Sequence, residues 1–148
     1  MSRKRVVVTG MGMLTPVGNT MEETWSNIIA SKSGVANITH FDTEGFGTHF
    51  SAGVKDFDLS NYLPPKEGKK MDLFIQYGMA AGIQAIKDAN LEVTEENADR
   101  IGVAIGSGIG GLPLIEKCHD ALNKSGPRRI SPFFVPGSII NMISGNLS

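Results

Sequence analysis

A glycine-rich turn between a strand signal and a helix signal constrains the fold of this chain more than any other feature. The turn covers Gly106–Gly111; it follows an expected strand over residues 100–106 and precedes a helix that Pro113 opens. Proline is favoured in the first turn of a helix because the N–H group there has no helical partner. A strand, a turn and a helix that alternate in this way are typical of α/β proteins. We therefore expect an α/β fold.

The rest of the chain repeats this alternation of helix and strand signals. Thr20 and Glu23 form a capping box ahead of an apolar helical face. Gly78 and Gly82 lie four residues apart in the strongest helical pattern, which predicts that another backbone packs close against them. The expected helices cover residues 21–31, about 71–89 with Asn90 as a left-handed stop, 113–124 and a run that begins at Ser138. The other expected strands are residues 5–9, buried on both faces, and a short one near residues 50–54.

The composition allows one domain or a part of a larger one. The 148 residues are 41% apolar, and 14 basic against 15 acidic residues give a formal charge of −1. This balance gives no indication of a nucleic-acid or membrane partner. The apolar run Val6–Val8 is shorter than the 7–15 residues of a secretory signal. We therefore expect a cytoplasmic protein that binds neither nucleic acid nor a membrane.

The glycine-rich turn has one alternative interpretation as a dinucleotide site. Gly106, Gly108 and Gly111 satisfy the pattern G-x-G-x-x-G between a strand and a helix. That site also needs a second parallel strand that ends in an acidic residue about twenty positions further on. Residues 129–132 occupy this place, and two prolines within five residues disfavour a central strand there. An NAD-binding oxidoreductase domain therefore stays open as the weaker hypothesis.

The cysteine and the histidines give no sign of a catalytic or metal site. Cys118 and His119 are neighbours on a helix, so their side chains project about 100° apart and do not face each other. His40 and His49 lack the spacing of metal ligands. We expect no catalytic residue, metal or cofactor among these residues.

Two basic clusters and a pair of phenylalanines are better candidates for binding. Each cluster directly precedes an apolar segment, which would fix its charges to a rigid element and present a patch to an acidic partner. Two phenylalanines between prolines fit an interface or an apolar pocket. The residues are Lys66, Lys69 and Lys70 in the first cluster, Arg128 and Arg129 in the second, and Phe133 and Phe134.

Four longer segments are shared, in the same order, with one enzyme family. They are Arg5–Gly12, Lys70–Asp72, Ile105–Gly111 and Gly126–Pro136. They resemble the β-ketoacyl-[acyl-carrier-protein] synthases of bacterial fatty-acid synthesis, and the synthase II branch most closely. The resemblance implies the N-terminal portion of a thiolase-like fold with α/β/α/β/α layers, usually found as a homodimer. It also implies an acyltransferase that condenses an acyl-enzyme thioester with malonyl-acyl carrier protein and releases CO2.

The same resemblance implies roles for individual residues. Ile109 matches the side chain that gates the acyl pocket, and Gly108 gives the loop around it backbone freedom. Phe134, with Phe133 beside it, matches a residue that reaches across the dimer interface to the neighbouring pocket. The basic residues match the surface that docks the acidic helix of acyl carrier protein: Lys66, Lys69, Lys70, Arg128 and Arg129.

The nucleophile of the family lies in a Thr-Ala-Cys type motif, which the resemblance places beyond Ser148. We therefore expect residues 1–148 to be an incomplete N-terminal half, with the catalytic cysteine and two histidines elsewhere. These 148 residues alone should show no condensing activity, and robust turnover in an active-site acylation assay would contradict this. A non-catalytic partner subunit that sets chain length is a further alternative.

Overall fold

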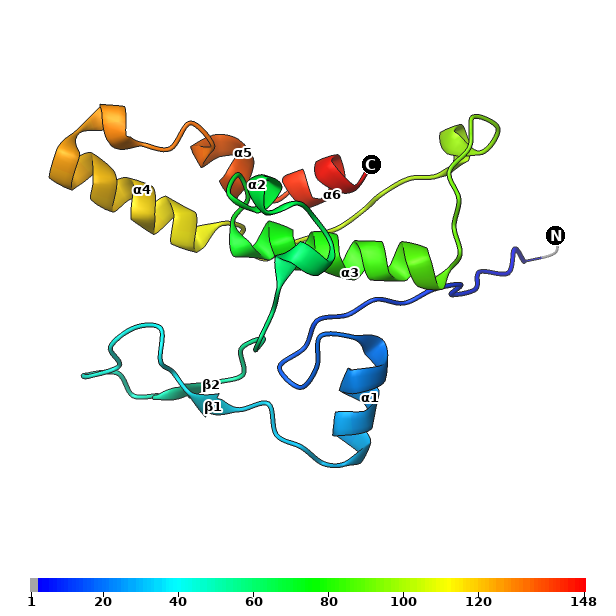
Figure 1. Ribbon diagram of the computed structural model, residues 1–148, viewed down its shortest axis with the longest axis horizontal. Coiled ribbons are helices and arrows are strands. Elements are labelled where there is room, and N and C mark those ends of the chain that lie inside the picture. Colours follow the sequence, from blue (N-terminus) through cyan, green and yellow to red (C-terminus); the bar gives the residue numbers. More distant parts are fainter. Residues whose placement is uncertain (1–2) are drawn as a thin grey trace.

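The computed structural model describes residues 3–148, which are arranged around the long helix α3 (Figure 1). Helix α6 packs along α3, and α4 packs against α5 beyond one end of α3. The strands β1 (Ala36–Asn37) and β2 (Phe50–Ser51) form an antiparallel pair in which Ala36 faces Ser51. The α-helices are α1 (Met21–Ile29), α2 (Pro65–Gly68), α3 (Leu73–Asp88), α4 (Leu112–Ser125), α5 (Phe134–Ser138) and α6 (Met142–Leu147). The 3-10 helices are η1 (Leu59–Asn61), η2 (Ala98–Arg100) and η3 (Pro127–Arg129).

The predicted helices α1, α3 and α4 are confirmed, together with their end signals except for the Glu23 half of the capping box, because Glu23 accepts from Asn19 N instead of Thr20 N. The Thr20 hydroxyl accepts a hydrogen bond from Glu23 N at 3.2 Å and so caps α1. Asn90 has a left-handed φ of 48° just after α3. Pro113 lies in the first turn of α4, and Gly126 ends that helix. Each of these signals acts within a few residues of the helix end, which explains why the sequence alone was sufficient.

The face of α3 that contains Gly78 is packed tightly, but by side chains instead of a backbone. A Cβ atom at Gly78 would lie 2.5 Å from Ile143 Cγ2, and Leu147 approaches Gly82 in the same way. Ile143 joins two buried residues of α3 in the apolar core: Ile75 and Met79. The glycines therefore make room for α6, which corrects the expectation of a second backbone at this face.

A close backbone approach does occur on α3, at the segment that follows the N-terminal valines. A Cβ atom at Gly10 would lie 2.5 Å from Ala85 O and from Ala89 N. Met11 N donates to Asp88 Oδ2 at 2.8 Å, and Met13 N donates to Gln84 Oε1 at 3.3 Å. Glycine at position 10 therefore lets the chain lie directly on the alanine stripe of α3, which consists of Ala81, Ala85 and the capping residue Ala89.

Two predicted strands, residues 5–9 and 100–106, are wrong for this structure. Within residues 3–148 neither segment has a hydrogen-bonded strand partner, and the side chain of Val6 is 94% exposed. Ile105 N instead donates to Ser144 Oγ of α6 at 3.0 Å. A strand exists only where a neighbour supplies the ladder, which β-branched residues alone do not provide. The strand expected near residues 50–54 is present but shorter, as β2.

The helix expected to begin at Ser138 is also wrong. Ser138 ends α5, and α6 begins only at Met142. The expected helices include none in the proline-rich run Pro127–Pro136, yet α5 begins there, because Pro136 lies in the first turn of that helix, where no intrahelical N–H donor is needed. Ser131 O accepts a hydrogen bond from Phe134 N at 3.0 Å at the start of this helix.

Candidate functional site

The structure brings the glycine-rich turn and the end of the proline-rich run together. Gly111 N donates to Ser138 O at 2.9 Å. Gly110 has a left-handed φ of 93°, and a Cβ atom there would lie 2.6 Å from the same carbonyl oxygen. Glycine is required at position 110 for both reasons. The two motifs that the sequence singled out therefore form one junction, which is the candidate functional site.

Asp72 lies at this junction, and sequence reasoning had assigned it no role. Its carboxylate Oδ2 accepts a hydrogen bond from Leu114 N at 2.7 Å, and its backbone N donates to Gly137 O at 3.2 Å. Asp72 is only 8% exposed and directly precedes α3. It therefore caps α4 from another element, an interaction that is worth about 0.5–2 kcal/mol when a helix caps itself. The available sequence signals were an aspartate placed just before an apolar helical pattern and its place in the shared segment Lys70–Asp72, and neither indicates a contact with α4.

The position of the Asp72 carboxylate argues against the dinucleotide hypothesis. A pyrophosphate would bind the free amide groups at the N-terminus of α4. Leu114 N is already bonded to the carboxylate, Gly111 N is bonded to Ser138 O, and Pro113 has no N–H. A negative charge therefore occupies the place where a pyrophosphate would have to bind. This turn is not built as a dinucleotide site.

Cys118 and His119 are not brought together as a reactive pair. The Cys118 side chain is buried within α4, whereas the His119 ring is exposed and contacts Asn123 Nδ2 at 3.1 Å. This agrees with the expectation that the two side chains do not face each other. Among residues 3–148, no three histidine, cysteine or acidic side chains are grouped as a metal site would require.

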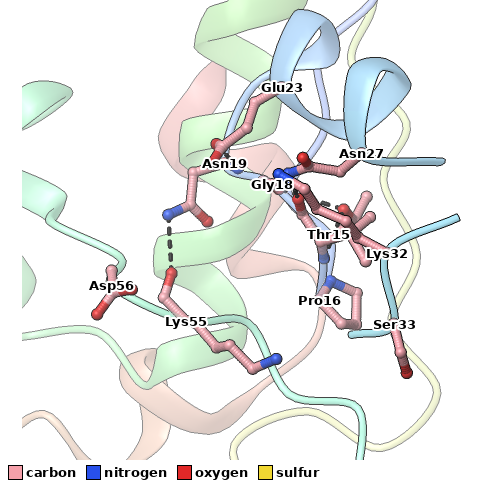
Figure 2. Close-up of a pocket in the computed structure, with 11 residues that line it drawn as sticks. Thr15, Pro16, Gly18, Asn19, Glu23, Asn27, Lys32, Ser33, Lys55 and Asp56 are labelled. Carbon is pink, nitrogen blue, oxygen red and sulfur yellow. Dashed lines mark hydrogen bonds between the residues drawn. The ribbon is translucent and has the colours of Figure 1, made fainter. Parts of the chain in front are cut away.

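A pocket of about 210 Å³ lies elsewhere, beside the turn that begins at Thr15 (Figure 2). Asn19 Nδ2 donates to the Lys55 carbonyl oxygen at 2.8 Å, as Figure 2 shows. Glu23 accepts a hydrogen bond from Asn19 N at 2.7 Å, and Lys55 Nζ donates to Gly34 O at 2.8 Å. Two of the charged side chains that line this pocket, Glu23 and Lys55, thus hold neighbouring backbone segments in place, which is a structural use.

The shifted pKa values also lie away from the junction. Hydrogen bonds from the Ser60 side chain and backbone lower the pKa of Asp58. A hydrogen bond from Lys124, together with its charge, lowers the pKa of Asp120. Burial raises the pKa of Tyr77. Local contacts account for each shift, and none of these three groups belongs to the glycine-rich turn or to α5.

A family comparison connects this arrangement to known proteins. Residues 3–148 match the model of the family described as beta-ketoacyl synthase, N-terminal domain. The chain belongs to this family. A 3-oxoacyl-[acyl-carrier-protein] synthase 2 from Vibrio cholerae is 65% identical over 148 residues, and one from Coxiella burnetii is 53% identical over the same length. Both alignments cover 100% of this chain and 36% of the relative, so the chain spans little more than a third of these relatives.

Solved structures of ketosynthases share the fold of this chain. One is a type II PKS acyl-carrier protein in complex with its ketosynthase bound to the hexaketide, with a TM-score of 0.77 and 28% identity. Another is the ishigamide ketosynthase/chain length factor, with a TM-score of 0.79 and 28% identity. The matches cover 99% of this chain and 40% and 36% of those chains. The predicted fold class, the N-terminal portion of a thiolase-like α/β fold, is therefore confirmed.

The residues expected to shape the family's acyl pocket lie on both sides of the junction. Ile109 is 73% exposed at the tip of the turn. An added Cβ at Gly108 would meet no atom within 4 Å. Phe134 begins α5 and is half-buried, with the more exposed Phe133 before it, whereas the turn contacts the other end of α5 at Ser138. The turn that contains Ile109 is thus connected to the phenylalanines through the backbone of α5.

The basic residues expected to dock a carrier protein are all exposed but do not form one cluster. Lys66 lies on α2, while Arg128 and Arg129 lie on η3, which Figure 1 shows at the far end of α4 from α2. Lys70 Nζ forms an ion pair with Glu67 at 2.8 Å, so its charge is partly offset. Lys69 follows α2 directly. The family's docking surface would here consist of two separate basic positions.

The described part of the chain contains no helix that is both long and apolar enough to cross a membrane.

Proposed function

We propose that the natural gene product containing this chain is a 3-oxoacyl-[acyl-carrier-protein] synthase. In the reaction, an acyl group on a cysteine sulfur is attacked by the carbanion that malonyl-acyl carrier protein forms on losing CO2. A carbon–carbon bond forms, the thioester to the cysteine breaks, and the products are 3-oxoacyl-carrier protein, CO2 and the free thiol. The observation that supports this proposal is the 65% identity across the whole chain to a relative of that name. The nucleophile itself is expected outside these residues.

The proposed partner is an acyl carrier protein, and the proposed assembly is a homodimer in the cytoplasm. The exposed cations on α2 and η3 support an acidic partner, because complementary charge steers docking and fixes its register. A similar ketosynthase was solved in complex with an acyl-carrier protein. The exposed Phe133 is 39% accessible in the single chain and supports a role at the dimer contact.

Condensation by the natural gene product tests the proposal directly. The purified protein is supplied with an acyl-carrier protein and malonyl-carrier protein labelled in the free carboxyl group. We expect labelled CO2 to be released together with one equivalent of 3-oxoacyl-carrier protein. Absence of both products with every acyl length tested would contradict the proposal.

A second candidate function is a chain-length partner subunit without its own nucleophile. The similarity to the ishigamide ketosynthase/chain length factor favours this alternative. The two candidates differ in whether the protein forms an acyl-enzyme. Intact mass after incubation with acyl-carrier protein should increase by the mass of one acyl group for the synthase and should not change for the partner subunit.

Ile109 is expected to limit the length of the acyl chain that the protein accepts. The Ile109 side chain is 73% exposed at the tip of the turn. Ile109→Phe adds volume there, so it should obstruct long acyl groups and spare short ones. We expect kcat/KM for a long acyl-carrier protein to fall about tenfold or more relative to a short one, the range that pocket size typically gives.

The matched control for Ile109 is Leu122→Phe, which enlarges a residue of α4 that is 42% exposed and lies at the opposite end from the turn. This control should leave the ratio of long to short substrates as in the unmodified protein. The same change of ratio in both variants would contradict the gating role.

A further inference from the structure

The glycine-rich turn is held firmly on one side and is open on the other. On the α4 side, Gly111 N donates to Ser138 O, and a Cβ at Gly111 would lie 2.8 Å from Ser138 Cα. On the side of residues 106–108, which form no strand, Cβ atoms at Gly106 and Gly108 would meet nothing within 4 Å, and Ser107 Oγ accepts a hydrogen bond from Gly110 N at 3.2 Å. Ile109 lies between the two parts. The position of Ile109 therefore depends on how firmly the α4 side is held, together with the Ser107–Gly110 hydrogen bond that spans Ile109.

Asp72 is the side chain that holds this firm side from another element. Its Oδ2 atom accepts the hydrogen bond from Leu114 N, and it lies 3.1 Å from the Cβ position of Gly111. Among the described residues the salt bridges are Lys70–Glu67 and Lys124–Asp120, so Asp72 is compensated by the amide and by the positive end of α4 instead of a cation. The Asp72 carboxylate is thus hydrogen-bonded to the first turn of α4.

The same residue also connects the turn to the basic surface. Asp72 N donates to Gly137 O, and a Cβ at Gly137 would lie 2.9 Å from the Lys70 carbonyl oxygen. Lys70 and Asp72 are two residues apart, so a displacement of the chain at Lys70 reaches the start of α4 through one short, tightly packed segment.

We propose that Asp72 is a positioning residue that sets the resting place of Ile109 by fixing the first turn of α4 and linking it to the segment at Lys70. This inference rests on the proposed function, because it assigns the acyl-length role of Ile109 a structural support. Asp72 touches neither substrate nor reacting atoms in this proposal. Its effect is on which acyl lengths are accepted.

Amide hydrogen exchange in the natural gene product tests the fixing of the turn without any assay of activity. In Asp72→Ala, exchange in the peptide covering residues 109–114 should become about tenfold faster or more, while exchange in α3 stays within about twofold. Asp72→Asn keeps an oxygen that accepts the bond from Leu114 N and should restore most of the protection. The control is Asp120→Ala, an exposed aspartate on α4. Unchanged exchange at 109–114, or equal acceleration throughout the protein, would overturn the proposal.

The acyl-length profile tests the consequence for Ile109. In Asp72→Ala we expect kcat for a long acyl group to change several-fold relative to a short one, while KM for the carrier protein stays within about twofold, and Asp72→Asn should return the ratio toward normal. An equal loss for all lengths would mean a merely structural role and overturn the inference. If the unmodified protein condenses no acyl group, the proposed function fails, and the exchange measurement alone decides whether Asp72 fixes the turn.

Discussion

Replacing Gly110 with alanine should lower the free energy of unfolding of the natural gene product by about 2–4 kcal/mol. Gly110 has a φ of 93°, a backbone region that L-residues with a Cβ atom seldom occupy. The new Cβ would also lie 2.6 Å from Ser138 O. Because that oxygen accepts the hydrogen bond from Gly111 N, the neighbouring backbone cannot move aside and keep the bond. Denaturant unfolding measures the loss.

Gly108→Ala is the matched control for this prediction. Gly108 lies two residues away in the same turn, outside the left-handed region, and an added Cβ would meet nothing within 4 Å. The change should alter the free energy of unfolding by no more than about 1 kcal/mol, with either sign, because alanine also restricts the unfolded chain. Equal losses in the two variants would show that the turn does not make the contacts described above.

Reversing the charge of Arg128 and Arg129 together should raise KM for acyl-carrier protein about tenfold or more at low salt, if carrier docking is as proposed. Both side chains are exposed on η3. The double change to glutamate replaces attraction of an acidic partner by repulsion. The difference between the variant and the unmodified protein should shrink as salt is added, because exposed charges are screened. Steady-state kinetics with varied carrier protein at two salt concentrations measure this.

The control for the docking surface is Lys117→Glu, a reversal at an exposed lysine on α4 outside the two basic positions. It should change KM for the carrier protein by no more than about twofold, although the net charge also becomes more negative. The two variants are compared by the rise in KM for each reversed charge. An equal rise per charge in Lys117→Glu and in the arginine variant would mean that only the net charge matters. Docking at η3 would then be contradicted.

Local signals predicted α1, α3 and α4 because each signal acts on its own neighbours. Thr20 caps α1 through a donor three residues away, and Asn90 ends α3 with its own backbone conformation. The valines at 6–8 gave a strong strand pattern, yet a strand also needs a partner, which residues 3–148 do not supply. The prolines around Phe133 and Phe134 gave no helix signal, yet Pro136 lies in α5 because the first turn of a helix accepts proline.

The candidate site was only partly predictable for the same reason. The glycine-rich turn and the proline-rich run each showed an unusual composition, so both were selected from the sequence alone. Their junction depends on contacts between residues far apart in the chain, such as Asp72 with Leu114, which are 42 positions apart. A single aspartate ahead of a helix is too common to indicate such a contact. The basic residues were found as two clusters, and only the structure showed that α4 separates them.

The docking of Gly10 on the alanine stripe of α3 also has a consequence for synthesis on the ribosome. Met11 is hydrogen-bonded to Asp88, 77 positions later in the chain. At roughly 5–20 residues per second, that partner is made roughly 4–15 seconds after Met11. During this interval residues 10–13 have no helix to dock on, whereas the valines at 6–8 stay exposed in the folded structure as well. Residues 10–13 are therefore available to a chaperone until α3 has emerged, and they can dock only after α3 has folded.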